Sequence, residues 1–220
     1  DMKTWNVNSA LPVSYQVKMV DGLFELGNRA LLEAGATDRQ GGMRRLIVID
    51  ERVNHFYGEK IQRYLKHHDV VYHVLSLATS EVTKNIDSVL RVVKAIDEFE
   101  VSRRHEPIIA IGGGVLLDIV GLAVSLYRRS TPWVRVPTTL IGLVDAGVGA
   151  KTGVNFGRHK NRIGSYFPSR ATLLDREFLK TLDRRHISNG LAEILKIALV
   201  KNRQLFELLE QYGATLIEER

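Results

Sequence analysis

The sequence predicts an α/β protein with a parallel sheet, followed by the start of a mostly helical domain. Short apolar runs that are typical of buried strands alternate with longer segments of helical spacing. A triple glycine, residues 112–114, separates one such strand from one such helix. From about residue 188 the pattern is helical only, with one apolar stripe. We therefore expect an α/β domain over residues 1–182 and the first helices of a second domain over residues 183–220.

The first half of the chain supplies six of the expected elements. Residues 13–20 alternate loosely, which indicates a strand, and residues 23–34 have helical spacing up to Gly35. A compact β-branched run at 45–49 indicates a second strand, which ends in Asp50. We then expect, in order, a helix over 59–66, a strand over 70–75 and a helix over 86–99.

The central elements surround the glycines. Residues 108–111 form an unbroken apolar run, as in a strand buried on both faces, and residues 115–127 are apolar over the length of a helix. Residues 133–136 indicate one more strand. This alternation favours a parallel sheet with helices on both faces, and such sheets bind ligands beyond the carboxyl ends of their strands. Three segments follow predicted strands in this way: Asp50, the glycine loop and Pro137-Thr138-Thr139.

Composition excludes several classes of protein and site. The 220 residues carry a net charge of +6, 45% hydrophobic residues and no cysteine. Without cysteine the chain has no disulfides and no thiolate metal ligands, and it suits a reducing compartment, which we expect to be the cytoplasm. No apolar run approaches the roughly 20 residues that cross a bilayer, and the polar N-terminal residues do not resemble a signal peptide. Because the basic residues are scattered, we expect neither nucleic acid nor membrane as a partner.

The glycine loop is the strongest local signal of a ligand. Glycine at a strand-to-helix turn lets the backbone approach a bound molecule closely, and the N–H groups of the following helix then point at it. Phosphate is the usual occupant of such a site. A tight turn without a ligand is the alternative interpretation of these residues alone.

A second polar region follows residue 137. Asp145, Lys151 and several glycines share one predicted loop, and Lys160-Asn161-Arg162 adds two cations and an amide. This mixture suits a site for an anion. A solvated loop with turn glycines is the alternative.

Glu193 and Lys196 lie three residues apart on the last predicted helix and therefore share a face. A surface ion pair is the common use of this spacing, and a metal ligand at Glu193 is the alternative. The seven histidines show no ligand spacing. Metal binding at Glu193 would need further partners.

Five motifs in a fixed order carry a family resemblance. They are Gly-Gly-Gly-Val-x-x-Asp at 112–118, Val-Pro-Thr-Thr-Leu at 136–140, Val-Asp-x-x-Val-Gly-x-Lys-Thr-Gly at 144–153, Lys160-Asn161, and Gly-Leu-Ala-Glu-Ile-Leu-Lys at 190–196. Together they resemble the dehydroquinate synthase superfamily over most of the chain from about residue 45. Details at Leu116-Leu117, 143–151 and 159–162 are similar to the sugar phosphate cyclases that act on sedoheptulose 7-phosphate, most of all the 2-epi-5-epi-valiolone synthases.

The resemblance implies an NAD-binding α/β domain over residues 1–182 and a helical domain for metal and substrate beyond it. Matching the motifs residue by residue places these side chains and loops around NAD: Asp50, Glu81, Lys84, Gly113, Gly114, Val115, Asp118, Thr138, Thr139, Lys151, Lys160, Phe178 and Thr181. The residues that the resemblance places around the substrate are Asp145, Lys151, Lys160, Asn161 and Lys196. Arg129 matches an arginine that reaches the substrate phosphate of the neighbouring subunit, so a homodimer is implied.

The resemblance also implies a divalent metal, usually zinc, with cobalt as an alternative. Glu193 matches the first metal ligand. The two histidine ligands of the family lie further downstream than residue 220. We therefore expect an incomplete metal site in this stretch of sequence, and the rest of the helical domain outside it.

The implied reaction is a lyase-type cyclisation of a phosphorylated seven-carbon sugar. NAD oxidises a substrate hydroxyl, phosphate is eliminated, the ketone is reduced back, and the ring opens and closes by aldol addition with no net redox change. A 3-dehydroquinate synthase and a metal-dependent polyol dehydrogenase are the alternative enzymes, and the second would release NADH. A non-catalytic NAD-binding fragment is a third hypothesis.

Overall fold

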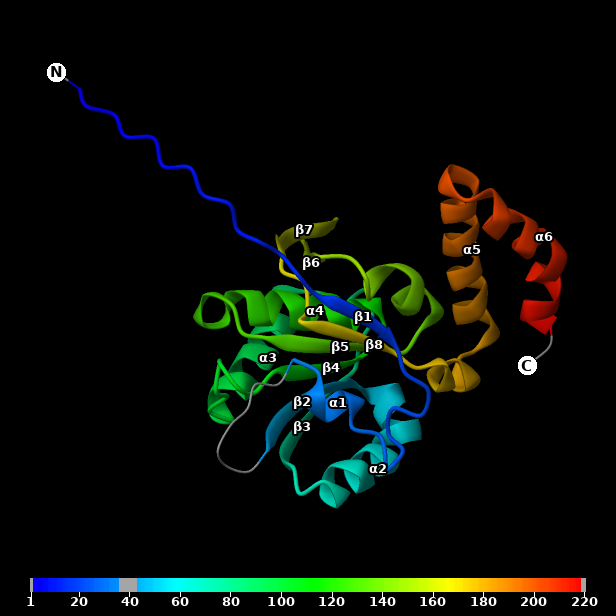
Figure 1. The fold of residues 1–220 in the computed structure, drawn as a ribbon, viewed down its shortest axis with the longest axis horizontal. Helices are drawn as coiled ribbons and strands as arrows, with labels where there is room; N and C mark the ends of the chain where they lie inside the picture. The colour runs from blue at the N-terminus through cyan, green and yellow to red at the C-terminus, as the bar shows by residue number, and fades with distance from the viewer. Residues whose placement is uncertain (1, 36–42, 219–220) are drawn as a thin grey trace.

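The computed structural model describes residues 2–35 and 43–218 and has a parallel sheet at its centre. The sheet has six strands in the order β1-β8-β5-β4-β2-β3, and every neighbouring pair in it is parallel (Figure 1). The predicted α/β class is confirmed. The strands are β1 Gln16–Met19, β2 Arg44–Asp50, β3 Val71–Leu77, β4 Ile108–Gly112, β5 Trp133–Pro137 and β8 Ala171–Leu174.

Each face of the sheet is covered by its own helices. Ile47 and Ile49 of β2 pack into a cluster with α1 (Ala30–Glu33) and α2 (Glu51–His67). Leu46 and Val48, which alternate with them, pack into a second cluster with α3 (Ile86–Glu98) and α4 (Gly114–Leu126). Strand alternation thus divides the apolar side chains between two buried layers.

Helix α2 begins eight residues earlier than the sequence indicated, at Glu51 instead of residue 59. The cause is Asp50, whose Oδ1 accepts hydrogen bonds from the N–H groups of Arg52 (2.9 Å) and Val53 (3.4 Å). A carboxylate at this position satisfies helix N–H groups that otherwise lack partners. The strand therefore passes into the helix without a loop, and the first turns of α2 lie at the carboxyl end of β2.

The helix expected over residues 23–34 is wrong. Turns occupy residues 21–27, and α1 is only four residues long. Gly22 has a φ of +66°, and the N–H of Leu23 donates to Oδ2 of Asp175 at 2.8 Å across the fold. Asn28 accepts from the N–H of Ala30 and donates to the carbonyl of Gly22. These contacts satisfy the backbone locally and with a distant strand end, in place of a helix.

The loop expected around Lys151 and Lys160 is also wrong, because a β-hairpin occupies it. After the short π-helical turn η2 (Gly142–Ala146), strand β6 (Lys151–Phe156) pairs antiparallel with β7 (His159–Tyr166). Gly153 faces Gly164, and a Cβ on Gly164 would collide with the carbonyl oxygen of Thr152. These glycines therefore permit close strand approach. The hairpin packs over α4 (Figure 1).

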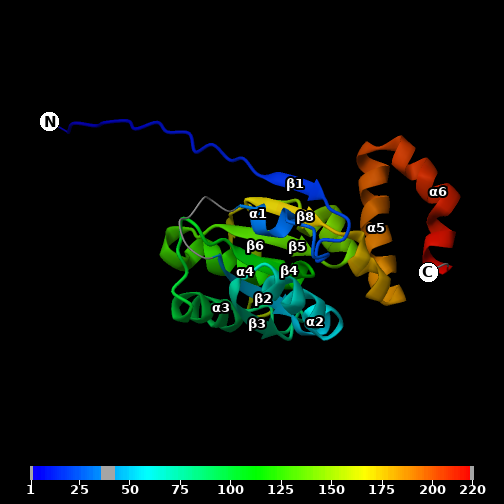
Figure 2. The same cartoon turned by 60° about the horizontal axis from the view of Figure 1, so that its bottom comes forward.

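Two helices end the described chain and lie beside the α/β body. Helix α5 (Arg184–Lys201) follows the short helix η3 (Arg176–Thr181), and α6 (Arg203–Glu218) turns back along α5. Figures 1 and 2 show this pair on the opposite side of the molecule from the extended N-terminal segment. Helix α5 begins close to the expected boundary at residue 182, while the division into two domains stays a prediction. None of the helices described here has the length and hydrophobicity that a bilayer crossing requires.

Candidate functional site

A pocket of about 390 Å³ opens at the carboxyl ends of β2, β4 and β5. Eight of the thirteen residues assigned to NAD by resemblance line it: Asp50, Gly113, Gly114, Val115, Thr138, Thr139, Phe178 and Thr181. The pocket lies where parallel sheets bind their ligands. The structure thus brings together segments that are more than 100 residues apart in the sequence.

The amino end of α4 forms one wall of the pocket. Gly113 is the N-cap residue of this helix, and no side chain of the described residues caps it. The leading N–H groups of α4 therefore lack side-chain acceptors, as in helix ends that hold phosphate. A Cβ on Gly113 would lie 3.0 Å from Cγ2 of Thr139, and a Cβ on Gly114 would lie 3.4 Å from Cβ of Ala146. The bare backbone leaves space for a large anion.

Asp50 also lines this pocket, at the carboxyl end of β2 where it caps α2. Its Oδ1 caps the helix, and its Oδ2 accepts a hydrogen bond from the hydroxyl of Thr79. An ionised carboxylate has about four acceptor sites, so Asp50 can still accept from a ribose hydroxyl while it caps α2. Its two protein contacts fix the orientation of the carboxylate.

Aromatic side chains form the apolar floor of the pocket. The ring of Tyr57 lies 4.9 Å from the ring of Phe178, centroid to centroid. The Tyr57 hydroxyl donates to the carbonyl of Glu177 at 3.1 Å and contacts Oγ1 of Thr181 at 3.2 Å. Burial raises the pKa of Tyr57, so the phenol stays neutral. The floor suits the flat, partly apolar ring of a nucleotide cofactor.

A polar network lies beside the pocket, under the β6–β7 hairpin. The Nζ of Lys84 is 2.6 Å from Oδ2 of Asp118 and donates to Oδ1 of Asn161 at 2.7 Å. Farther out, Lys160 pairs with Glu81 at 3.4 Å. Burial raises the pKa of Asp118, and the ammonium group of Lys84 opposes this rise. The network connects the loop after β3, helix α4 and the hairpin.

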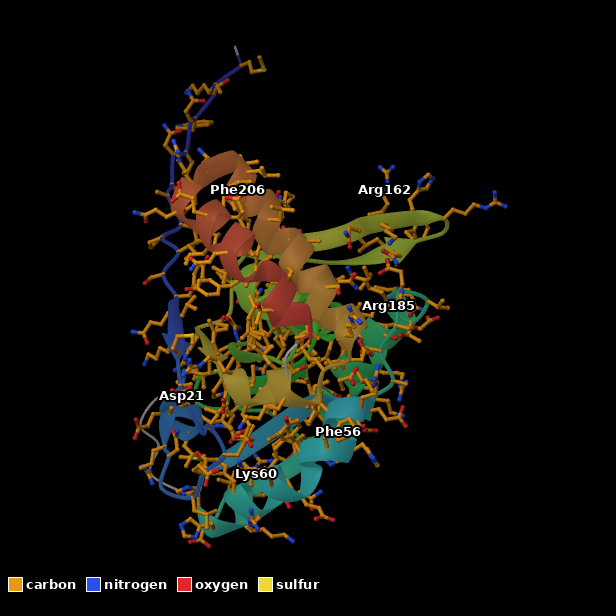
Figure 3. The ribbon with its side chains drawn as sticks, turned by 90° about the vertical axis from the view of Figure 1, so that its right-hand side faces the viewer. Asp21, Phe56, Lys60, Arg162, Arg185 and Phe206 are labelled. Atoms are coloured by element: carbon orange, nitrogen blue, oxygen red, sulfur yellow. The ribbon has the colours of Figure 1, made fainter. Side chains whose placement is uncertain are left out.

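Lys151 lines a second pocket of about 380 Å³, together with Asp118, Asn161 and Arg162. Figure 3 looks onto this end of the molecule. In that view Arg162 on the hairpin and Phe56 on α2 lie on either side of Arg185, which marks the start of α5. One lysine and one arginine side chain, beside an amide and a carboxylate, suit a phosphorylated, polyhydroxylated molecule.

Glu193 and Lys196 form an ion pair on α5, as their spacing indicated. The hydrogen bond to Glu193 raises the pKa of Lys196, and the carboxylate of Asp145 acts in the same direction. Within residues 2–35 and 43–218 no three His, Cys, Asp or Glu side chains lie close enough to hold a metal ion. Glu193 alone supplies one ligand group, so the described residues do not make a metal site.

Arg129 lies outside both pockets, beyond the carboxyl end of α4. It is exposed, in a turn where Arg128, Arg129 and Ser130 have φ values of 50°, 64° and 129°. Three consecutive non-glycine residues with positive φ are uncommon. The role of Arg129 across a dimer stays a prediction.

Sequence reasoning missed several residues of the first pocket. Most of them lie on the first turns of α2 or at the start of α5. The sequence signal for the residues on α2 is Asp50: as an N-cap it predicts that a helix begins directly after β2. The missed residues are Arg52, Val53, Phe56, Tyr57, Thr79, Ser80, Ile141, Leu182, Asp183 and His186.

Comparisons with known proteins give one matching family model and several similar proteins. The family model for the N-terminal part of 3-dehydroquinate synthase matches residues 74–189. A 2-epi-5-epi-valiolone synthase from an Actinomyces species is 59% identical over 216 residues, which is 98% of this chain and 57% of that protein. One from Actinoplanes sp. SE50/110 is 54% identical and matches 99% of this chain and 54% of its own.

A solved structure is similar over the same range. It is the 2-epi-5-epi-valiolone synthase ValA from Streptomyces hygroscopicus subsp. jinggangensis 5008, with NAD+ and Zn2+ bound. The TM-score is 0.91 at 55% sequence identity, over 98% of this chain and 57% of that chain. This chain therefore spans little more than half the length of the relatives it matches.

Proposed function

This chain belongs to the 3-dehydroquinate synthase family, and on that premise we propose that its protein converts sedoheptulose 7-phosphate to 2-epi-5-epi-valiolone with loss of phosphate. One observation carries the proposal. The amino end of α4, which no described side chain caps, lines the first pocket at Gly113 and Gly114, and Asp118 of the same helix lines the second pocket with Lys151. The choice of substrate rests on the likeness to 2-epi-5-epi-valiolone synthases.

NAD+ is the proposed occupant of the first pocket, where it would supply a reversible hydride acceptor. The amino end of α4 would hold the pyrophosphate, and Asp50 would accept from a ribose hydroxyl. Tyr57 and Phe178 would cover an apolar face of the cofactor. Glu81, Lys84 and Asp118 are proposed to contact its far end through the polar network.

The proposed substrate occupies the second pocket. Lys151, Lys160 and Asn161 would bind the phosphate and hydroxyl oxygens, and the two ammonium groups would offset negative charge that develops as phosphate leaves. Asp145 on η2 and Lys196 on α5 interact electrostatically and are proposed to orient the remaining hydroxyls. A fixed set of donors is effective here because it needs no rearrangement during the reaction.

A divalent metal, zinc or cobalt, is proposed for the whole protein with Glu193 as one ligand. Within the described residues no three potential ligand side chains come together, so no step is assigned to the metal here. A homodimer, in which Arg129 reaches the partner's site, and a cytoplasmic role in natural product biosynthesis complete the proposal.

Substrate choice tests the proposal. We expect the full-length protein to have a higher kcat/KM for sedoheptulose 7-phosphate than for the seven-carbon keto acid phosphate used by 3-dehydroquinate synthases. A keto acid carries a second anion, its carboxylate, which would need another fixed cation. Both rates can be measured by phosphate release. A higher kcat/KM for the keto acid would assign the chain to the alternative, a 3-dehydroquinate synthase.

A further inference from the structure

Arg135 is a cation buried at the centre of the fold. It lies on β5, is only 1% exposed, and its Cζ is 4.5 Å from the centroid of the Trp133 ring. Burial lowers its pKa to about 10. Because taking a charge out of water is costly, a buried guanidinium needs specific hydrogen-bond acceptors.

The acceptors are backbone carbonyls of one turn. The Nη1 of Arg135 donates to the carbonyl oxygens of Gly147, at 3.3 Å, and Gly149. Thr172 on β8 is the register partner of Arg135, and its hydroxyl donates to the same Gly147 oxygen at 2.7 Å. Side chains of two neighbouring strands, β5 and β8, therefore bind the carbonyl groups of the turn over residues 147–149.

This turn connects two residues of the proposed substrate site. The carbonyl of Asp145 accepts from the N–H groups of Val148 at 3.0 Å and Gly149 at 3.2 Å. Lys151 follows Gly149 by two residues and begins β6. A shift of the turn would displace Asp145 and Lys151 together.

We propose that Arg135 is a positioning residue: by holding the turn over residues 147–149, it sets where Asp145 and Lys151 stand relative to the substrate. The inference rests on the proposed function. Small displacements of groups that act on a substrate reduce turnover strongly. A purely stabilising role for the buried guanidinium is the competing explanation.

Arg45 provides a matched control on β2. It is 4% exposed and also holds backbone carbonyls, donating to Arg44 at 2.7 Å and Leu32 at 3.1 Å. In both arginines Nε lacks a partner in the described part of the chain. Arg45 lies near the amino end of its strand, away from both pockets.

The experiment compares Arg135→Met with Arg45→Met in the full-length protein. Thermal unfolding, the Kd for NAD+ and kcat with sedoheptulose 7-phosphate are measured for each. We expect both variants to lose stability, whereas only Arg135→Met loses kcat, by about 100-fold, with its Kd for NAD+ unchanged. Arg135→Lys should recover part of the loss, since it keeps the charge without the planar fork.

Equal kcat losses in the two methionine variants, or a parallel loss of NAD+ affinity in Arg135→Met, would overturn the inference. If Arg135→Met does not fold, Thr172→Val serves as the test of positioning. This variant removes the other side-chain donor to the Gly147 carbonyl and nearly keeps the shape of the side chain. A reduced kcat with normal NAD+ binding supports positioning, and an unchanged kcat contradicts it.

A second readout separates this inference from the proposed function. The rate at which an amine reagent labels Lys151, followed by mass spectrometry, needs no substrate. A rate that changes in Thr172→Val and the Arg135 variants, but not in Arg45→Met, supports displacement of Lys151. An unchanged rate contradicts it, even if the wild-type protein leaves sedoheptulose 7-phosphate unconverted and the proposed function fails.

Discussion

Gly114→Val should abolish NAD+ binding in an otherwise folded protein. The branched side chain would stand at the amino end of α4, in the space proposed for the pyrophosphate. We expect the Kd for NAD+ to rise by about 100-fold, which corresponds to about 2.8 kcal/mol and lies at the upper end of the roughly 1–3 kcal/mol that an overpacked side chain costs. Isothermal titration calorimetry measures the change.

Gly213→Val is the matched control, because Gly213 also lies in a helix and its added Cβ would meet nothing within 4 Å. Gly114→Ala should raise the Kd for NAD+ by less than Gly114→Val, since its added Cβ approaches only Ala146, at 3.4 Å. Normal affinity in a folded Gly114→Val protein would remove the glycine loop from the cofactor site.

Lys151→Ala should lower kcat strongly while leaving the fold intact. Lys151 is exposed at the first position of β6 and lines the second pocket. Loss of one preorganised charge contact to the reacting group costs roughly 100-fold or more in turnover. Phosphate release at saturating substrate gives kcat, and thermal unfolding checks that the variant is folded.

Lys94→Ala is the control for Lys151→Ala. Lys94 lies on α3, its side chain is 75% exposed, and its i,i+4 pair with Glu98 is of the kind that contributes little to stability. We expect wild-type turnover in this variant. Near-normal turnover in Lys151→Ala as well would favour the solvated-surface interpretation of Lys151.

The sheet and the pocket at its carboxyl edge could be predicted because local pattern and tertiary structure agree there. The run at 108–111 is apolar at every position, and the strand it forms is buried throughout. The glycines after it open a helix with no side-chain cap among the described residues. A single sequence therefore indicated both the strand and the place where a ligand would bind.

Other segments depend on contacts that a local pattern does not contain. Residues 23–34 have helical spacing, but the contact of Leu23 with Asp175 across the fold favours turns. The glycines around Lys151 indicated a loop, whereas Gly153 and its partner Gly164 allow two strands to approach each other.

Arg135 shows the same limit for the site. In Trp133-Val134-Arg135-Val136 no local pattern indicates what the arginine would contact. Its acceptors lie 12 and 14 residues further along the chain, in the turn over residues 147–149, and the arginine is a buried donor to them. Only the three-dimensional arrangement reveals this role.

In the proposed reaction the site uses NAD+ without consuming it. Full-length protein with sedoheptulose 7-phosphate and a substoichiometric amount of NAD+ tests this claim directly, with released phosphate, absorbance of NADH and the carbon skeleton of the product followed together. We expect phosphate in excess of the NAD+ supplied, a carbocyclic product and no accumulated NADH. Formation of NADH in proportion to the substrate consumed, without release of phosphate, would contradict the cyclase and identify a dehydrogenase.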